Sequence, residues 1–194
     1  MLLLAYTGLR FGEAAALRVG HVDMLARRAT ITEAVTEVNG RSVFGTPKNH
    51  QRRTVPLPRF LLDDLARLME GREPDAFVFT APDSGHLRLS NWRTRVFDPA
   101  VRAAGLVDVS PHDLRHTAAS LAVGSGASIK DVQRMLGHAS AAMTLDVYAG
   151  LFTESLDGVA DRMEAIARAA AASLRPGASV VDLADHARRA RKTI

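Results

Sequence analysis

Residues 110–116 read Ser-Pro-His-Asp-Leu-Arg-His, a stretch that places an imidazole and a guanidinium three residues apart where a helix is expected to begin. Ser110 is predicted to cap this helix and Pro111 to fit its first turn. His112 and Arg115 then share one helical face. The arginine side chain is a permanently charged, planar group with several hydrogen-bond donors, and the histidine side chain gains or loses a proton near neutral pH. Together they are suited to bind a phosphate whose negative charge increases as it reacts. Such a pair also occurs at ordinary polar helix starts, so its interpretation depends on the rest of the chain.

Four other positions along the chain carry related chemistry. Upstream, Arg10 follows a glycine break and begins a helix, where backbone N–H groups can join it in holding an anion. Lys48 stands in a Thr-Pro-Lys-Asn turn between two strand-like runs. Downstream, His138 ends a Leu-Gly-His sequence after a helical segment, and Tyr148 follows ten residues later. The order along the chain is therefore arginine, lysine, His-x-x-Arg, Leu-Gly-His and tyrosine.

In this order and spacing the sequence resembles the catalytic domain of the tyrosine recombinase (phage integrase) family, from residue 1 to about residue 175. The resemblance implies a site-specific DNA recombinase that cuts and rejoins DNA strands. It implies that the hydroxyl of Tyr148 attacks the scissile phosphorus and leaves a 3′-phosphotyrosyl link and a free 5′-hydroxyl. The covalent link retains the energy of the phosphodiester, so a second strand is joined without ATP, and no cofactor is expected.

The same resemblance implies a role for each remaining catalytic residue. Arg10 and Arg115 hold the non-bridging oxygens and stabilise the charge that grows in the transition state. Lys48 protonates the leaving 5′-oxygen, His112 assists proton movement from the tyrosine, and His138 donates to the phosphate.

Further residues are expected to support the site or to contact DNA. Glu13 is interpreted as orienting the arginine site, and His116 as a packed, hydrogen-bonded histidine that supports its helix. Arg93, Arg95 and Arg102 share one expected helix and are candidates for phosphate contacts, which DNA-binding proteins need in number.

The hydrophobic pattern predicts a mostly helical α+β domain with one small three-stranded antiparallel sheet. From Ala29 the apolar period is two, and Asn39-Gly40 is a strong hairpin signal. A returning strand is expected at 41–46 and a third at 52–57, with Lys48 at the tip of the second hairpin. Helices are predicted at residues 11–18, 58–69, 90–104, 128–136, 140–148 and, with an amphipathic stripe, 156–170.

The composition indicates one substantial globular domain. The chain has 194 residues, 47% of them hydrophobic, which suffices for one core and not for two ordinary domains. Its 25 Lys and Arg against 21 Asp and Glu give a net charge of +4, and a pI near 10.1 favours a basic surface for nucleic acid. Cysteine is absent and no apolar run reaches membrane-spanning length, so we expect a protein of the reducing cytoplasm, associated with the nucleoid and not with a membrane.

The two ends of the chain are expected to differ. An apolar helical run stands at Met1 with no cap, so the core-binding domain that by resemblance precedes a catalytic domain is expected to be absent. The catalytic domain is expected to span residues 1–175, with a basic tail at 176–194. By resemblance, the partner is double-stranded DNA, on which the chain forms a homo-oligomer that is tetrameric in the synapse.

Three other interpretations are open at this point. His112, His116 and His138 could bind zinc, but Arg115 between the helical histidines would repel a cation, and no metal is expected. A type IB topoisomerase by resemblance shares the fold and the phosphotyrosine chemistry, but it relaxes supercoils alone. A DNA-binding remnant that no longer cuts is the third, and the match at all six catalytic positions argues against it.

Overall fold

The computed structural model describes residues 1–47, 52–151 and 156–173, so Lys48 and the tail 176–194 lie outside the described residues. The chain divides into two compact units, residues 1–152 and 153–194. The described part of the second unit is one helix, α9 (Leu156–Ser173), which confirms the helix expected there; its Met163 and Ile166 are exposed. None of the helices in the described ranges combines the length and apolar character of a membrane span.

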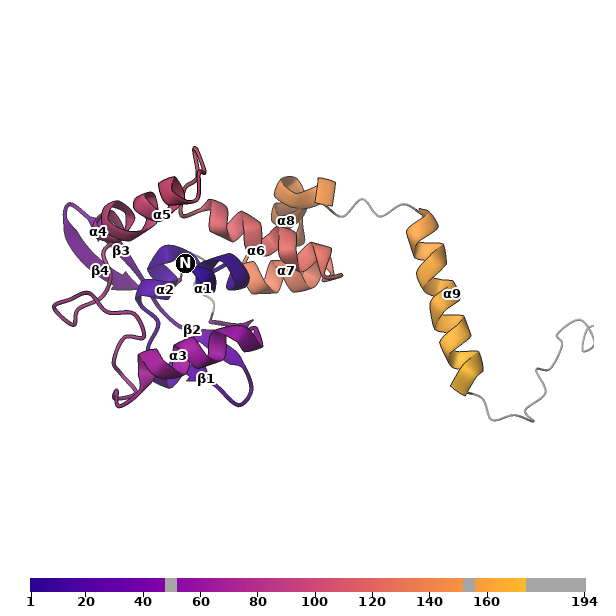
Figure 1. Ribbon diagram of the computed structural model, residues 1–194, viewed down its shortest axis with the longest axis horizontal. Helices are drawn as coiled ribbons and strands as arrows, with labels where there is room; N and C mark the ends of the chain where they lie inside the picture. Colours follow the sequence, from indigo (N-terminus) through magenta and orange to yellow (C-terminus); the bar gives the residue numbers. More distant parts are fainter. Residues whose placement is uncertain (48–51, 152–155, 174–194) are drawn as a thin grey trace, which may run out of the picture. The chain divides into compact units, whose positions relative to one another are not determined.

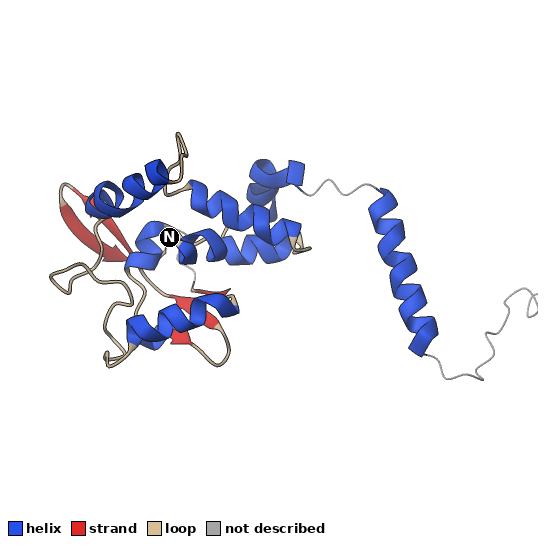
Figure 2. Ribbon diagram, in the orientation of Figure 1, coloured by secondary structure: helices blue, strands red, loops and turns tan. Residues whose placement is uncertain are grey.

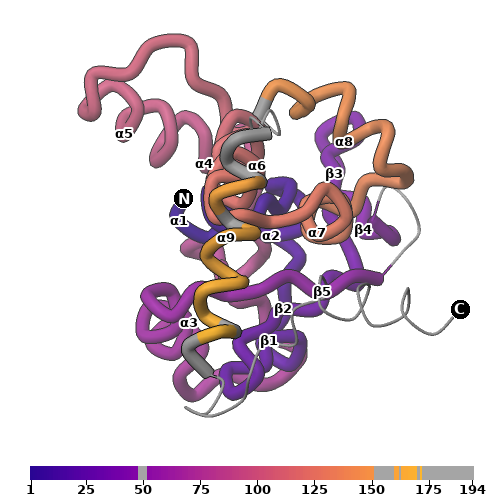
Figure 3. Tube along the Cα trace, turned by 90° about the vertical axis from the view of Figure 1, so that its right-hand side faces the viewer, coloured from indigo at the N-terminus to yellow at the C-terminus, as the bar shows by residue number. Residues whose placement is uncertain are grey.

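The first unit is mostly helical with a small antiparallel sheet, as the sequence predicts (Figure 2). Figures 1 and 3 label its α-helices and strands. The α-helices are α1 (Leu2–Thr7), α2 (Phe11–Ala15), α3 (Leu62–Met69), α4 (Leu89–Trp92), α5 (Asp98–Ala103), α6 (Asp113–Gly124), α7 (Ile129–Leu136) and α8 (Ala141–Tyr148). Shorter helical turns are η1 (Val19–His21), η2 (Arg59–Leu61), the π-helical η3 (Arg93–Phe97) and η4 (Ala149–Leu151). The strands are β1 (Val22–Asp23), β2 (Arg28–Ile31), β3 (Ala34–Val38), β4 (Arg41–Gly45) and β5 (Arg53–Pro56).

The three-stranded sheet is built from other strands than those expected. Its order is β1-β2-β5, whereas β3 and β4 form a separate two-stranded hairpin. β2 and β5 pair antiparallel, with Ala29 opposite Val55, and both side chains are fully buried together with Ile31. Pairing β2 with β5 buries the apolar faces of both strands in one core. The outer part of the β3-β4 hairpin is exposed and offers no comparable apolar face. The prediction that the strands at 41–46 and 52–57 form a second hairpin is therefore wrong.

The hairpin turn predicted at Asn39-Gly40 is confirmed. Asn39 and Gly40 both have positive φ, 50° and 72°, as a two-residue hairpin turn requires. Its base packs on the unit, since Val35 is buried and the ring of Phe44 stacks on Phe77 with 5.8 Å between centroids. Nearer the turn, the hydroxyl oxygen of Ser42 lies 2.7 Å from Nε2 of His86, so the hairpin contacts the unit at more than one point.

The helix expected at residues 11–18 ends early, at Ala15, because the chain that follows pairs with a distant segment. The backbone N–H of Val78 donates to Leu17 O at 2.8 Å, and that of Val19 donates to Ala76 O at 2.9 Å. These strand-like bonds satisfy the backbone at residues 17–19 and compete with helical ones.

The predicted cap at Ser110 is also wrong. α6 begins at Asp113, after Pro111, and the N–H and hydroxyl of Ser110 both donate to the Asp113 carboxylate, at 2.8 and 2.6 Å. The carboxylate, and not the serine, therefore organises this turn, where a negative charge also suits the helix dipole. Ser90 lies inside α4, which begins at Leu89.

Serine side chains cap the two following helices, which confirms the helices expected at 128–136 and 140–148. The hydroxyl oxygen of Ser128 accepts from Asp131 N–H at 3.2 Å at the start of α7, and that of Ser140 accepts from Met143 N–H at 3.3 Å at the start of α8. Gly137 ends α7 in the left-handed conformation, with φ of 67°. Local signals therefore set both ends of α7.

Among the described residues, three clusters of buried apolar side chains hold the first unit together, one of them formed by Ala15, Ala16 and Val35. The largest joins α1, the sheet and α3. Another lies among α6, α7 and α8, which lie side by side (Figures 1 and 3), and it contains Ala119, Val132, Leu136 and Tyr148. Because Tyr148 belongs to this cluster, the position of its hydroxyl depends on how these three helices pack.

Candidate active site

Arg115 lies at the centre of the site and is 2% exposed. One terminal nitrogen donates to Gly8 O at 2.5 Å, where α1 ends, and the other donates to Leu136 O at 2.6 Å, where α7 ends. Burial, aided by the positive charges of Arg10 and Arg53, lowers its pKa to about 10, so the guanidinium remains protonated at neutral pH. Two of the five guanidinium N–H groups donate to these two carbonyls, and the other three take no part in these two hydrogen bonds.

Glu13 binds two arginines and is 1% exposed. Arg10 donates to it through its backbone N–H at 2.8 Å and its guanidinium at 3.2 Å. Arg53 donates through both terminal nitrogens, at 2.9 and 2.6 Å, in the bidentate arrangement that favours an arginine–carboxylate pair. Burial alone would raise the pKa of Glu13, but hydrogen bonding and charge from Arg53 and Arg10 outweigh it and hold the pKa below its usual value. Glu13 thus holds Arg10 and Arg53 on one carboxylate.

Arg53 is the residue that sequence reasoning missed. Besides its pair with Glu13, its Nε donates to Met135 O at 3.1 Å, near the end of α7. A signal was available: in β5 it lies two residues before Val55 and so shares the inward face of the strand, where an arginine needs a buried carboxylate. Gly137 packs directly on it, since a Cβ at Gly137 would stand 2.8 Å from Arg53 Cδ.

His138 follows the left-handed Gly137 and lies partly buried. Its Nδ1 is 3.0 Å from the hydroxyl oxygen of Thr144, a fully buried residue of α8. Burial and the charges of Arg115, Arg10 and Arg53 lower its pKa to about 4, so the imidazole is neutral at pH 7 and keeps one N–H to donate.

Tyr148 is the last residue of α8 and is 5% exposed. Burial raises the pKa of its hydroxyl, and the charge of Arg115 opposes this change. The hydroxyl oxygen lies 2.8 Å from Nδ1 of His116. The interpretation of His116 as a packed, hydrogen-bonded histidine therefore finds its partner, and that partner is the tyrosine.

His112 lies one helical turn before His116 and is exposed. Their rings meet edge to face with 4.9 Å between centroids. Partial desolvation, then the charges of His116, Arg115 and Arg10, lower the pKa of His112. Among the described residues, the tyrosine hydroxyl has its hydrogen bond to His116, so the structure does not bring His112 to the tyrosine in the way the sequence led us to expect.

A hollow of about 450 Å³ opens beside this cluster between β5 and α7. Five of the described residues that line it carry a full positive charge and none is acidic. Its lining residues are Arg10, Pro47, Arg52, Arg53, Thr54, Lys130, Gln133, Arg134, Gly137 and His138. A hollow of this charge is suited to an anion larger than a single phosphate group.

The three arginines proposed as DNA contacts lie elsewhere, on the helical stretch formed by α4, η3 and α5. All three are exposed, and Arg93 forms an ion pair with Asp98 at 3.2 Å. None of them lines the basic hollow.

The zinc alternative finds no support in the described ranges, where no three His, Cys, Asp or Glu side chains gather closely enough to hold a metal ion. His112 and His116 are adjacent, whereas His138 binds Thr144.

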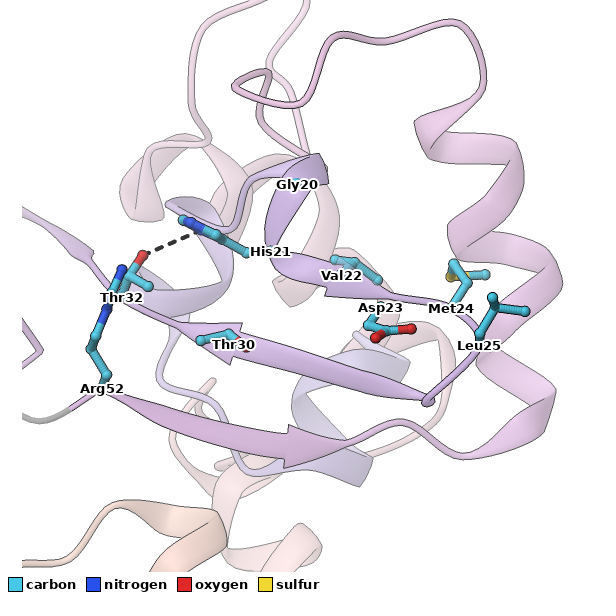
Figure 4. A pocket seen from close by; sticks show the side chains of 9 residues that line it. All are labelled: Gly20, His21, Val22, Asp23, Met24, Leu25, Thr30, Thr32 and Arg52. Atoms are coloured by element: carbon cyan, nitrogen blue, oxygen red, sulfur yellow. Dashed lines mark hydrogen bonds between the residues drawn. The ribbon is translucent and has the colours of Figure 1, made fainter.

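A second hollow, of about 660 Å³, lies along β1 and β2 (Figure 4). In it His21 and Thr32 point toward each other, with 3.2 Å between Nδ1 and the hydroxyl oxygen. Arg52 lines both hollows, but no residue of the predicted catalytic set lines this one.

Comparisons with known proteins agree with this arrangement. A putative prophage phiRv2 integrase of Mycobacterium tuberculosis is 32% identical over 151 residues, which are 75% of this chain and 40% of that protein. Tyrosine recombinase XerC of Corynebacterium efficiens is 32% identical over 158 residues, 79% of this chain and 46% of that protein. The chain thus spans about half the length of the curated relatives it matches.

Solved structures with the same fold include an integrase of the transposon Tn1549, determined with transposon right end DNA. Its TM-score is 0.70 at 21% identity, covering 86% of this chain and 57% of that one. XerA recombinase gives a TM-score of 0.60 at 24% identity, covering 86% and 56%. These likenesses establish the fold. The model of the phage integrase family matches residues 1–154, most of the chain, and the chain therefore belongs to the phage integrase family, as its resemblance led us to expect.

Proposed function

We propose that this chain is the catalytic domain of a site-specific DNA recombinase, which cuts and rejoins DNA strands through a 3′-phosphotyrosyl intermediate. The observation that carries the proposal is a buried tyrosine with a histidine on its hydroxyl, in the same unit as Arg115 and as Arg10 and Arg53, which share the Glu13 carboxylate and line one basic hollow. We assign the catalytic domain to residues 1–175 and a basic tail to 176–194.

In this proposal the hydroxyl of Tyr148 attacks the scissile phosphorus. Arg10 and Arg115 stabilise the charge on the non-bridging oxygens, a task for which rigidly held donors are effective because they need no reorganisation during the reaction. The bonds of Arg115 to two backbone carbonyls hold its guanidinium in this way. His138, neutral at pH 7, donates its remaining N–H to the phosphate.

Lys48 protonates the leaving 5′-oxygen in this scheme. A 5′-bridging phosphorothiolate tests the role, because its sulfur leaves without a proton. Lys48→Ala is expected to cleave this substrate far better than ordinary DNA, and equal impairment on both substrates would exclude Lys48 as the acid.

The partner that we propose is double-stranded DNA, bound along the basic hollow and along the exposed arginines Arg93, Arg95 and Arg102. We further propose that protomers assemble on DNA, as a tetramer in the synapse, and that α9 contributes to that assembly through its exposed Met163 and Ile166. With DNA as substrate, the site of action is the nucleoid in the cytoplasm. Deleting the residues after Gly150 should weaken cooperative assembly more than binding to one site, as a gel-shift titration on one-site and two-site DNA would show.

The test of the proposed function is covalent capture on a nicked suicide substrate, scored as a protein–DNA band that survives denaturation. The chain is expected to form this band, and Tyr148→Phe is expected to lose it while retaining DNA binding, because one hydroxyl contributes little to attraction by many phosphates. A band that persists in Tyr148→Phe would exclude Tyr148 as the nucleophile. A chain that binds DNA and never forms the band would be a non-cutting DNA-binding protein.

A further inference from the structure

Two histidines lie one turn apart on α6, and the structure separates their surroundings. His112 is exposed, whereas His116 is partly buried and has the hydroxyl of Tyr148 at 2.8 Å from its Nδ1. A phenol whose pKa is raised by burial is a protonated, weak nucleophile at neutral pH, and it needs a proton acceptor when it attacks. The group in hydrogen-bonding contact with it is His116.

The tyrosine is also held in position from the other side. One turn earlier on the same face of α8, the hydroxyl oxygen of Thr144 lies 3.0 Å from Nδ1 of His138. α8 therefore contacts one histidine through Thr144 and another through Tyr148. These two contacts fix α8 relative to α6 and to the end of α7, and so place the hydroxyl of Tyr148 beside His116.

We propose that His116 is a catalytic residue that positions the hydroxyl of Tyr148 and accepts its proton during strand cleavage, an inference that rests on the proposed function. As the Tyr148 oxygen forms its bond to phosphorus, its O–H bond breaks and the proton passes to Nδ1 of His116. The bond from phosphorus to the 5′-oxygen breaks, and that oxygen receives its proton from the acid of the proposed function. In the religation step the 5′-hydroxyl attacks phosphorus and gives its proton back to that same group. The bond from phosphorus to the tyrosine oxygen then breaks, and His116 returns its proton to that oxygen.

His112 then has a different role from the one expected from the sequence. Its ring lies edge to face with that of His116, at 4.9 Å between centroids, and it is exposed to solvent. Desolvation and the charges of His116, Arg115 and Arg10 lower its pKa, so His112 is a poorer proton acceptor than an ordinary histidine and serves as the neighbour of the base. The contact with the nucleophile itself belongs to His116.

The experiment combines two substitutions at the reacting pair, in the full chain. His116→Asn keeps a polar atom near the Nδ1 position but cannot take a proton. Replacement of Tyr148 by 3,5-difluorotyrosine supplies a more acidic phenol that needs less help to ionise. Rates of covalent capture on the nicked substrate are measured for all four combinations at pH 7, with thermal melting and DNA binding as checks on folding. The matched control is His21→Asn, because His21 also has its Nδ1 near a hydroxyl but lies in the hollow of Figure 4.

With tyrosine at position 148, His116→Asn is expected to slow capture by roughly 100-fold or more, the range typical of a lost general base. With difluorotyrosine the same substitution should cost about tenfold or less, since the base is then less needed. His21→Asn should leave the rate unchanged. An equal loss with both phenols, or no loss with tyrosine, overturns the role of His116 while the recombinase proposal stands.

Two further outcomes also have a defined interpretation. If His116→Asn melts at a markedly lower temperature than the native chain, His116→Gln replaces it in the same four-way comparison and is judged by the same ratio. If the native chain itself forms no covalent product, the proposed function fails and this inference fails with it.

Discussion

Arg115 stabilises the fold and, in the proposed function, also binds the reacting phosphate. Its two bonds join the end of α1 to the end of α7, across 107 and 21 residues of sequence. Arg115→Lys should therefore lose most of the cleavage activity, because an ammonium does not reproduce the planar fork. It should also lose about 1–3 kcal/mol of unfolding free energy, since one carbonyl is left without its donor. Suicide-substrate kinetics and urea unfolding measure the two effects; wild-type rates would show that Arg115 is not at the phosphate.

Glu13 should make the stability of the first unit depend on pH. Its pKa is lowered in the folded chain, so its contribution is fully present above the unfolded value of about 4.5 and is lost as the pH falls through the folded value. Glu13→Gln should cost about 3–5 kcal/mol at pH 7, because two arginines lose their charged partner. Urea unfolding across pH 3–7 is expected to show the difference between native and variant chains shrinking toward acid pH. A difference that stayed constant would mean that the carboxylate is not ionised in the fold.

Single residues also show what sequence patterns can and cannot predict. The helix stop at Gly137 and the caps at Ser128 and Ser140 were predictable, because each depends on neighbours within four residues. The partners of Arg53 and His116 were not, since they lie 40 and 32 residues away and become visible only when the elements pack. The candidate site was thus predictable as a set of residues, but not as a set of pairs.

At the scale of elements, α8 connects the tyrosine to His138. Thr144→Val keeps the shape of the side chain but removes the hydroxyl near His138, so the imidazole loses the contact that orients it. We expect covalent capture to slow by roughly tenfold, with unfolding free energy lower by about 1–3 kcal/mol. Thr117→Val is the matched control, because Thr117 is exposed and its hydroxyl donates to a carbonyl of its own helix. Equal rates for the two variants would show that Thr144 does not position His138.

Strand pairing is where the sequence was least informative. The period of two at β2, β3 and β4 identifies strands, but it does not specify their partners. The partner of β2 was decided by burial of Ala29 and Ile31 against Val55, a contact between segments that no local signal connects. The early end of α2 has the same origin, since pairing with residues 76–78 replaced the last turn that local propensity favours.

At the scale of the first unit, the basic hollow predicts how DNA binding responds to salt. Each phosphate that a basic side chain neutralises makes the plot of log affinity against log salt concentration steeper by about one unit. Arg134→Gln should therefore weaken binding uniformly across DNA sequences and reduce the slope by about one. Arg67→Gln, on α3 and paired with Asp64, should leave the slope unchanged. Equal slopes for both variants would place the DNA away from the hollow.

The two carbonyls held by Arg115 have a practical consequence for anyone who needs an inactive version of this chain. Replacing that arginine would remove the hydrogen bonds that join α1 to α7 and would also remove a catalytic side chain. An inactive Arg115 variant therefore does not distinguish loss of folding from loss of catalysis. Tyr148→Phe keeps the ring inside its cluster and forfeits one hydroxyl. Tyr148→Phe is therefore the better inactive variant for isolating complexes with uncut DNA. Arg115 variants are better suited to measure how much the contact between α1 and α7 contributes to folding.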